Sequence, residues 1–198
     1  MRIISGELRG RQWKVTTTTN FRPTCDRIRE AIFNILDTTV QNVAVGDVFC
    51  GMGGFGLEAL SRGARRAYWI DSDRRAMSDL KQVISDWGIS DRGRVLVGPA
   101  EKMLKRLPAP VQILFADPPF FYDNWPQLLR VAADPRAVAD DGLFIAEVSS
   151  RENFVAGPLW RVEDERHYGD ARVWFMRKNR ALVDYPDAES AVADDGNG

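Results

Sequence analysis

The stretch that decides the fold is a glycine-rich turn, which reads Asp47-Val48-Phe49-Cys50-Gly51-Met52-Gly53-Gly54-Phe55-Gly56. Its glycines have the G-x-G-x-x-G spacing, which lets a backbone turn tightly and approach a ligand closely. The turn follows a predicted strand over residues 45–50 and precedes a predicted helix over residues 57–62. A strand, a glycine turn and a helix in this order predict a parallel sheet that binds a nucleoside-containing cofactor.

Outward from this turn, strands and helices alternate along the chain. Predicted strands cover residues 66–70, 94–97, 111–116 and 143–148, and predicted helices cover residues 77–87, 100–107 and 124–133. Residues 160–168 and 172–177 are expected to form an antiparallel pair that turns at Gly169-Asp170. These units predict a Rossmann-like α/β fold with a mostly parallel seven-stranded sheet and helices on both faces. In such sheets the ligand lies beyond the carboxyl ends of the strands.

Two acidic residues beside the glycine turn bear on the identity of the cofactor. Asp71 ends the next strand, where its carboxylate can accept hydrogen bonds from ribose hydroxyls, but a nicotinamide dehydrogenase would show much the same pattern. Asp47 suits the positively charged methionine end of S-adenosylmethionine and suits a pyrophosphate poorly. The helix after Gly56 begins with Leu57-Glu58, so no basic residue there meets a phosphate. These details favour S-adenosylmethionine over a dinucleotide, and a turn kept for packing alone is the structural alternative.

The predicted strand at 111–116 closes on a second motif, Asp117-Pro118-Pro119-Phe120. Two successive prolines remove two backbone donors and stiffen the chain. The carboxylate of Asp117 and the carbonyl of Pro118 then offer two acceptors that match the two N–H groups of an exocyclic amine, and Phe120 offers a face on which the ring can stack. Such acceptors free the nitrogen lone pair, and alignment with the methyl–sulfur bond supplies much of the remaining acceleration. The motif therefore indicates methyl transfer to a planar amine; a proline-rich turn without chemistry is the alternative.

The charges of the chain are unevenly placed, although the formal net charge of its 198 residues is only −1. The first thirty residues hold seven Arg or Lys and three acidic residues, whereas the stretch from residue 184 onward holds five acidic residues and no Lys or Arg. The acidic tail is expected to be disordered. In the basic part, residues 2–5 and 11–15 predict a hairpin, and a helix is expected from Thr24, as its cap, to about Asp37.

Composition excludes several classes of protein. Apolar residues make up 44% and charged residues 28% of the chain, as in an ordinary globular protein. No apolar run reaches membrane-spanning length, the N-terminus lacks the apolar core of a signal peptide, and two cysteines give no disulfide framework. A cytoplasmic enzyme is therefore expected. The lone histidine, His167, cannot make a metal site, so no metal is expected.

Sequence strings in the N-terminal part narrow the function. They read Arg2-Ile3-Ile4-Ser5-Gly6, Arg9-Gly10-Arg11, Arg22-Pro23-Thr24-Cys25-Asp26-Arg27-Ile28-Arg29-Glu30 and Phe33-Asn34-Ile35-Leu36. With the glycine turn, Asp71 and the D-P-P-F motif, they make the chain resemble the bacterial 16S ribosomal RNA guanine-N2 methyltransferase family (RsmD-like), whose members are class I S-adenosylmethionine-dependent methyltransferases. The resemblance covers residues 2–178. It implies methyl transfer from S-adenosylmethionine to N2 of one guanine in the 16S ribosomal RNA of the small subunit.

The same resemblance implies roles for individual residues. The residues that would hold the guanine are Asp117, Pro118 and Phe120. The cofactor-binding residues would be Asp47, Gly51, Gly53, Asp71, Ala100 and Thr24. The candidate RNA-binding residues are Arg9, Arg11, Arg22 and Arg27, and a solvated basic surface is the alternative for the two arginines of the hairpin. Pro99 departs from the pattern, because a polar residue is more usual beside the adenine.

Three parts of the chain are expected: an RNA-facing extension at residues 1–40, a methyltransferase domain at 41–180 and an acidic tail at 181–198. A near-neutral total charge favours a substrate already partly covered by protein, such as an assembling 30S subunit, since binders of naked RNA are usually more basic. A monomer is expected. Alternatives left open are a DNA adenine-N6 or protein glutamine methyltransferase, because both use similar four-residue strand ends, and a catalytically silent RNA-binding assembly factor.

Overall fold

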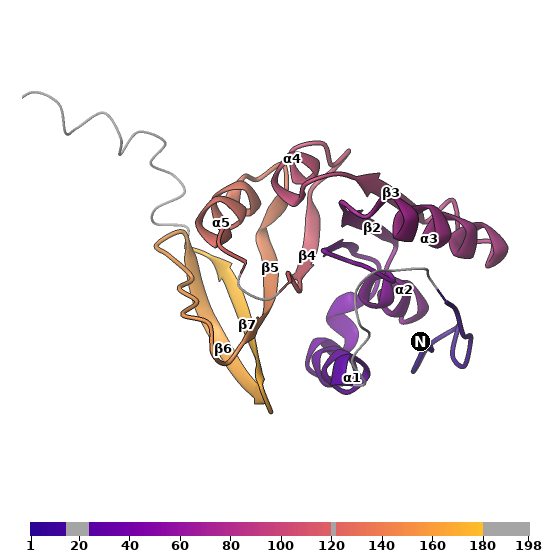
Figure 1. The fold of residues 1–198 in the computed structure, drawn as a ribbon, viewed down its shortest axis with the longest axis horizontal. Coiled ribbons are helices and arrows are strands. Elements are labelled where there is room, and N and C mark those ends of the chain that lie inside the picture. Colours follow the sequence, from indigo (N-terminus) through magenta and orange to yellow (C-terminus); the bar gives the residue numbers. More distant parts are fainter. Residues whose placement is uncertain (15–23, 120–121, 180–198) are drawn as a thin grey trace, which may run out of the picture.

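The computed structural model describes residues 1–14, 24–119 and 122–179, and leaves the side chains of residues 24 and 25 undescribed. Seven strands form one sheet in the order β3-β2-β1-β4-β5-β7-β6 (Figure 1). The pairs from β3 to β5 are parallel, and β7 runs antiparallel to both β5 and β6. This arrangement confirms the predicted mostly parallel seven-stranded sheet.

The strands and helices alternate as the sequence predicts. The strands are β1 (Ala44–Val48), β2 (Arg66–Asp71), β3 (Gly93–Val97), β4 (Val111–Ala116), β5 (Val138–Ser149), β6 (Trp160–Tyr168) and β7 (Ala171–Lys178). The helices are α1 (Thr24–Leu36), the short 3-10 helix η1 (Asp37–Val40), α2 (Gly54–Ser61), α3 (Arg74–Asp86), α4 (Ala100–Leu104) and α5 (Trp125–Ala133).

Two apolar layers cover the two faces of the sheet. One layer packs side chains of α1, α2, α3 and the N-terminal segment (residues 1–14) against the strands, and the other packs α4 and α5. Figure 1 shows α1 and α2 on one side of the central strands and α4 and α5 on the other. Apolar side chains of the N-terminal segment, such as Ile3 and Trp13, lie in the same core as α2. None of the described helices is long and apolar enough to cross a membrane.

Several element boundaries differ from the prediction. Helix α1 begins at Thr24, so Thr24 lies within its first turn and is not its cap, and the helix ends at Leu36 because Asp37 has a left-handed backbone with φ of 43°. Helix α2 begins three residues early, at Gly54, because the left-handed Gly53 forms its N-cap. Helix α4 ends at Leu104, shortly before a proline, and β5 begins early, at Val138, through a register shift opposite β4.

Within residues 1–14, the predicted N-terminal hairpin shows one isolated antiparallel bridge, between Arg2 and Gln12. The chain does fold back, since Ile3 N–H donates to the Arg11 carbonyl at 3.0 Å. Gly6, at φ of 88°, lies so close to α2 that a Cβ there would stand 1.8 Å from the carbonyl oxygen of Ser61. The same carbonyl accepts the N–H of Glu7 at 2.8 Å. The two arms of the segment therefore remain hydrogen-bonded to each other, while its turn packs on α2.

Candidate functional site

The carboxyl ends of β1, β2 and β4 meet at one edge of the sheet. Val48 of β1 pairs with Ile70 of β2 on one side and with Ala116 of β4 on the other. The residues that follow these positions, Asp71 and Asp117, therefore flank the chain as it leaves β1. Backbone hydrogen bonds continue this pairing, since Asp117 N–H donates to the Val48 carbonyl at 3.5 Å. The register thus places the second motif beside the glycine turn, as the order of the strands predicts.

The glycine turn (residues 49–53) is held in an unusual backbone conformation. Phe49, Gly51 and Gly53 all have positive φ values, of 58°, 49° and 74°. A left-handed phenylalanine is uncommon, and such residues gather at ligand-binding sites. Gly53 N–H closes the turn by donating to the Cys50 carbonyl at 2.7 Å. A Cβ on Gly53 would stand 2.7 Å from the Leu80 side chain, so a larger residue would require the turn or that side chain to shift.

Asp71 binds the glycine turn with one oxygen and its own loop with the other. Its Oδ2 accepts Gly51 N–H at 2.9 Å, and its Oδ1 accepts Asp73 N–H at 2.9 Å. These two bonds fix the plane of a half-exposed carboxylate at the end of β2. Next to it lies an open depression of about 640 Å³, lined by Ser72, Arg74, Val97, Gly98 and Pro99. The fixed carboxylate and the depression suit a ribose and a flat ring, respectively.

Three further residues are expected at the cofactor. Gly51 faces open space, since a Cβ built on it meets no atom within 4 Å. Ala100 is buried, with 5% of its surface exposed, one residue past the depression. Thr24 opens α1, and its side chain is outside the described atoms.

Asp47 is a buried carboxyl group within the sheet. It is 2% exposed, and its Oδ2 accepts Gly56 N–H at 2.9 Å in the first turn of α2. Burial, aided by the nearby charges of Asp71 and Asp117, raises the pKa of Asp47 to about 8, although the Gly56 hydrogen bond and Arg29 oppose the shift. Three carboxyl groups therefore share this edge. Asp71 and Asp117 give this edge a negative field, to which Asp47 adds when it is ionised, and such a field suits a cationic ligand.

The motif that follows β4 begins at this same edge of the sheet. Asp117 and Pro118 are half-buried and Pro119 is exposed, while Phe120 lies outside the described residues. The described residues resume with Tyr122, whose ring packs edge-on against that of Phe49 with the ring centroids 5.0 Å apart.

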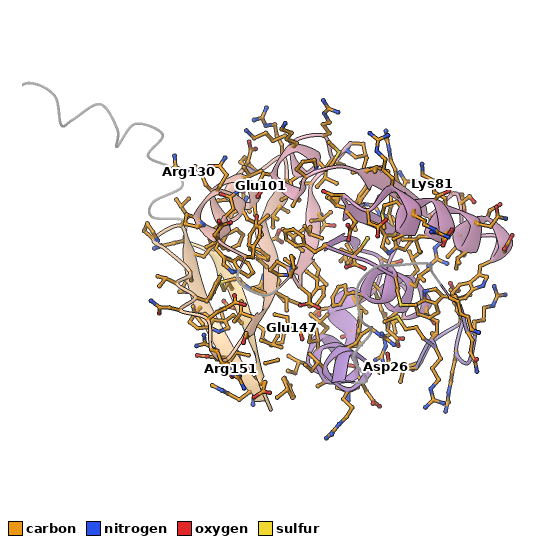
Figure 2. All side chains as sticks on the ribbon, in the orientation of Figure 1. Asp26, Lys81, Glu101, Arg130, Glu147 and Arg151 are labelled. Carbon is orange, nitrogen blue, oxygen red and sulfur yellow. The ribbon has the colours of Figure 1, made fainter. Side chains whose placement is uncertain are left out.

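A carboxylate on α4 holds the segment that follows this motif. Tyr122 donates its hydroxyl hydrogen to Glu101 Oε1, and Asn124 Nδ2 donates to the same oxygen at 2.7 Å. Figure 2 labels Glu101 at α4. Burial and the Glu101 carboxylate both raise the pKa of Tyr122. Sequence reasoning missed this link, because more than twenty residues separate its partners and no periodic pattern marks it.

Three of the four arginines expected to contact RNA lie on the surface. Arg9, Arg11 and Arg27 are exposed, whereas Arg22 lies outside the described residues. The guanidinium of Arg11 stands over the ring of Trp87, 5.5 Å from its centroid. Within the described ranges, no group of three or more His, Cys, Asp or Glu side chains could hold a metal ion.

Glu58 in α2 anchors the N-terminal segment. The sequence alone suggests only that no basic residue is present at this position to bind a phosphate. Its side chain is fully buried and accepts the N–H groups of Ile4 and Ser5 at 2.8 and 3.0 Å. It also pairs with Arg62 at 2.8 Å and with Arg29 at 3.8 Å. The i, i+4 spacing to Arg62 is the one signal of this role in the sequence.

Comparison with known proteins places the chain in a family. The family described as conserved hypothetical protein 95 matches residues 1–177. The chain belongs to this family. It is 32% identical over 170 residues to ribosomal RNA small subunit methyltransferase D of Escherichia coli K12, with 85% of each chain covered. The protein of the same name from Haemophilus influenzae is 26% identical over 172 residues, covering 85% of this chain and 89% of the relative. The RsmD-like resemblance is thereby confirmed.

Solved structures share the fold of this family. The E. coli protein yhhF is 30% identical, with a TM-score of 0.78, and the match covers 90% of this chain and 97% of that chain. The hypothetical protein TTHA0928 of Thermus thermophilus is 26% identical, with a TM-score of 0.73, and the match covers 89% of this chain and 99% of that chain. The fold is the Rossmann-like class I methyltransferase fold.

Proposed function

We propose that the protein transfers a methyl group from S-adenosylmethionine to the exocyclic N2 of a guanine in 16S ribosomal RNA. The observation that carries the proposal is the position of Asp117 and Pro118 beside the glycine turn and Asp71, at one edge of the sheet. Relatives named ribosomal RNA small subunit methyltransferase D, which match most of the chain, support an RNA substrate. The exposed Arg9, Arg11 and Arg27 supply positive charge for its phosphates.

The residues at this edge fit the proposed cofactor. Bound S-adenosylmethionine supplies a methyl group on a positively charged sulfur, so no metal or covalent nucleophile is needed. Asp71, fixed by Gly51 and by its own loop, would hold the ribose hydroxyls. Asp47 would stabilise the cationic methionine end through the field that it shares with Asp71 and Asp117. The depression at Val97, Gly98 and Pro99 would receive the adenine.

Asp117 and Pro118 would prepare the acceptor nitrogen. Each of the two acceptors takes one N–H of the guanine amine, which draws the nitrogen toward tetrahedral geometry and frees its lone pair. As the nitrogen gains positive charge in the transition state, the carboxylate of Asp117 would stabilise that charge in a partly dehydrated site. After methyl transfer the nitrogen would lose one proton, to Asp117 or to water. The Glu101 link holds the following segment in place.

Mass spectrometry of ribosomal RNA nucleosides tests the proposal. Cells that lack the protein should lose one N2-methylguanosine from 16S RNA, and the purified protein with S-adenosylmethionine should restore it. We further expect 30S subunits to be better acceptors than protein-free 16S RNA, because the protein has almost no net charge. Methylation of DNA or of a glutamine peptide in place of RNA would refute the proposal, and an undiminished cellular function of an inactive variant would favour an assembly factor.

The raised pKa of Asp47 predicts a pH-dependent cofactor affinity. Below pH 8 the ligand-free protein holds a proton on Asp47, because its pKa is about 8. A cationic ligand favours the ionised carboxyl group, so binding releases that proton. The affinity for S-adenosylmethionine should therefore rise with pH up to about pH 8 and level off above it. Calorimetric titration in buffers of different ionisation enthalpy measures both the affinity and the released proton.

Asp47→Asn is the control for this prediction. The side chain keeps its size, but the titrating group is gone, so the rise in affinity with pH should flatten. S-adenosylhomocysteine, which lacks the sulfonium charge, should show a weaker pH dependence with the unaltered protein. An equally steep rise in the Asp47→Asn variant would assign the titration to another group.

A further inference from the structure

Two tryptophan side chains hold neighbouring carbonyl groups of the glycine turn. The indole N–H of Trp13, from the N-terminal segment, donates to the Met52 carbonyl at 2.8 Å. The indole N–H of Trp69, from β2, donates to the Gly53 carbonyl at 3.1 Å. The first bond joins segments that are 39 residues apart in the sequence. The turn is therefore hydrogen-bonded both to the sheet and to the N-terminal segment.

The bond from Trp13 fixes more than one atom of the turn. A peptide unit is planar, so holding the Met52 carbonyl also sets the direction of the Gly53 N–H in the same plane. That N–H closes the turn by donating to the Cys50 carbonyl. The closed turn in turn presents Gly51 N–H to Asp71, whose carboxylate it orients. Three hydrogen bonds thus connect the indole of Trp13 to the carboxylate of Asp71.

Trp13 is itself held firmly. Its side chain is 5% exposed, and its ring meets Trp87 edge-on, with centroids 5.6 Å apart. The segment that carries it is anchored independently of the turn, because Glu58 accepts the N–H groups of Ile4 and Ser5 on α2. An anchored, buried donor can restrain a flexible glycine turn, whereas a loose one would move with it.

We propose that Trp13 is a positioning residue for the cofactor: the N-terminal segment braces the glycine turn so that Asp71 meets the ribose in a fixed orientation. The identity of the ligand rests on the proposed function above. The brace lowers the conformational freedom that the turn must lose when the cofactor binds, which is a preorganisation effect on affinity. Its removal should change cofactor binding and leave the chemistry at Asp117 untouched.

Trp13→Phe tests this proposal, with Trp160→Phe as the matched variant. Phenylalanine keeps a buried aromatic ring but removes the indole N–H and the second ring, and the matched variant accounts for the loss of volume. Trp160 is equally buried and donates a comparable bond, at 2.9 Å, to the Leu129 carbonyl, far from the turn. Calorimetry with S-adenosylhomocysteine, which needs no RNA, should show binding about three- to tenfold weaker for Trp13→Phe, the range expected for one hydrogen bond. Trp160→Phe should bind as the unaltered protein does.

The kinetic and structural readouts separate positioning from simple destabilisation. In Trp13→Phe the KM for S-adenosylmethionine should rise with little change in kcat, and amide hydrogen exchange should quicken at Gly51 and Gly53. If both variants weaken binding equally, or if Trp13→Phe binds and exchanges as the unaltered protein does, the proposal is overturned. Absence of S-adenosylhomocysteine binding by the unaltered protein would instead overturn the proposed function itself.

A second measurement decides if Trp13→Phe folds poorly. Amide hydrogen exchange of the turn is then measured in the unaltered protein with and without ligand. A turn that is unprotected from exchange before the ligand binds contradicts the proposal that Trp13 restrains it.

Discussion

Replacing Asp117 by Asn should lower kcat for methyl transfer about 10²- to 10³-fold, the effect expected when one charge-stabilising group is lost from an active site. Asparagine keeps the shape and one acceptor oxygen but lacks the negative charge that meets the developing positive charge on the amine. Its NH₂ group would also face a donor of the substrate. The rate should be measured under single-turnover conditions with 30S subunits and labelled S-adenosylmethionine, so that product release does not hide the loss.

The variant Asp141→Asn is the matched control for this change. Asp141 is exposed in the amino-terminal half of β5, and the substitution makes the same change of charge away from the proposed site. It should leave kcat unaltered. Binding of S-adenosylhomocysteine should persist in Asp117→Asn, because the glycine turn and Asp71 are intact. A kcat close to that of Asp141→Asn would show that Asp117 does not stabilise the transition state.

The sheet was predictable because its central strands are buried on both faces. Strand β4 has the predicted bounds, Val111–Ala116, since five of its six residues are buried and a continuous apolar run is the pattern of such a strand. The common position of the strand ends is then also predictable, because parallel strands bring their carboxyl ends to one edge of the sheet. Asp71 and Asp117 could therefore be assigned to a shared site from their positions in the sequence alone.

The parts that the sequence did not reveal depend on contacts between distant segments. Trp13 is buried, but no local sequence pattern predicts its hydrogen bond to Met52. The link from Tyr122 to Glu101 likewise depends on how α4 and the chain after β4 come together. Turn residues predict that residues 1–14 fold back on themselves, but no local pattern predicts the close approach of Gly6 to α2.

The sheet and the N-terminal segment therefore have different roles at the proposed site. The sheet sets where the three carboxyl groups lie, while the N-terminal segment restrains the turn between them. Both Trp13 and Glu58 hold that segment, one at the turn and one at α2. Loss of the anchor at α2 should therefore affect the stability of the whole protein and also the brace at the turn.

Replacing Glu58 by Gln should destabilise the protein by about 3–5 kcal/mol, the cost expected when one member of a buried ion pair is removed. The side chain of Glu58 is fully buried, and Gln would leave Arg29 and Arg62 without its charge. The amide could accept only one of the two N–H groups of Ile4 and Ser5, and its own NH₂ would oppose the other. Thermal unfolding should shift downward by about 6–20 °C for a chain of this size.

The variant Glu30→Gln, which removes a carboxylate exposed on α1, separates the loss of an anchor from a change of net charge. It should unfold close to the temperature of the unaltered protein. At temperatures where Glu58→Gln is still folded, protease should cleave its N-terminal segment faster, and S-adenosylhomocysteine should bind more weakly, in the same direction as in Trp13→Phe. If Glu58→Gln and Glu30→Gln unfold at the same temperature, the buried network does not anchor the segment. If only stability falls while binding is kept, the anchor at α2 and the brace at Met52 act independently.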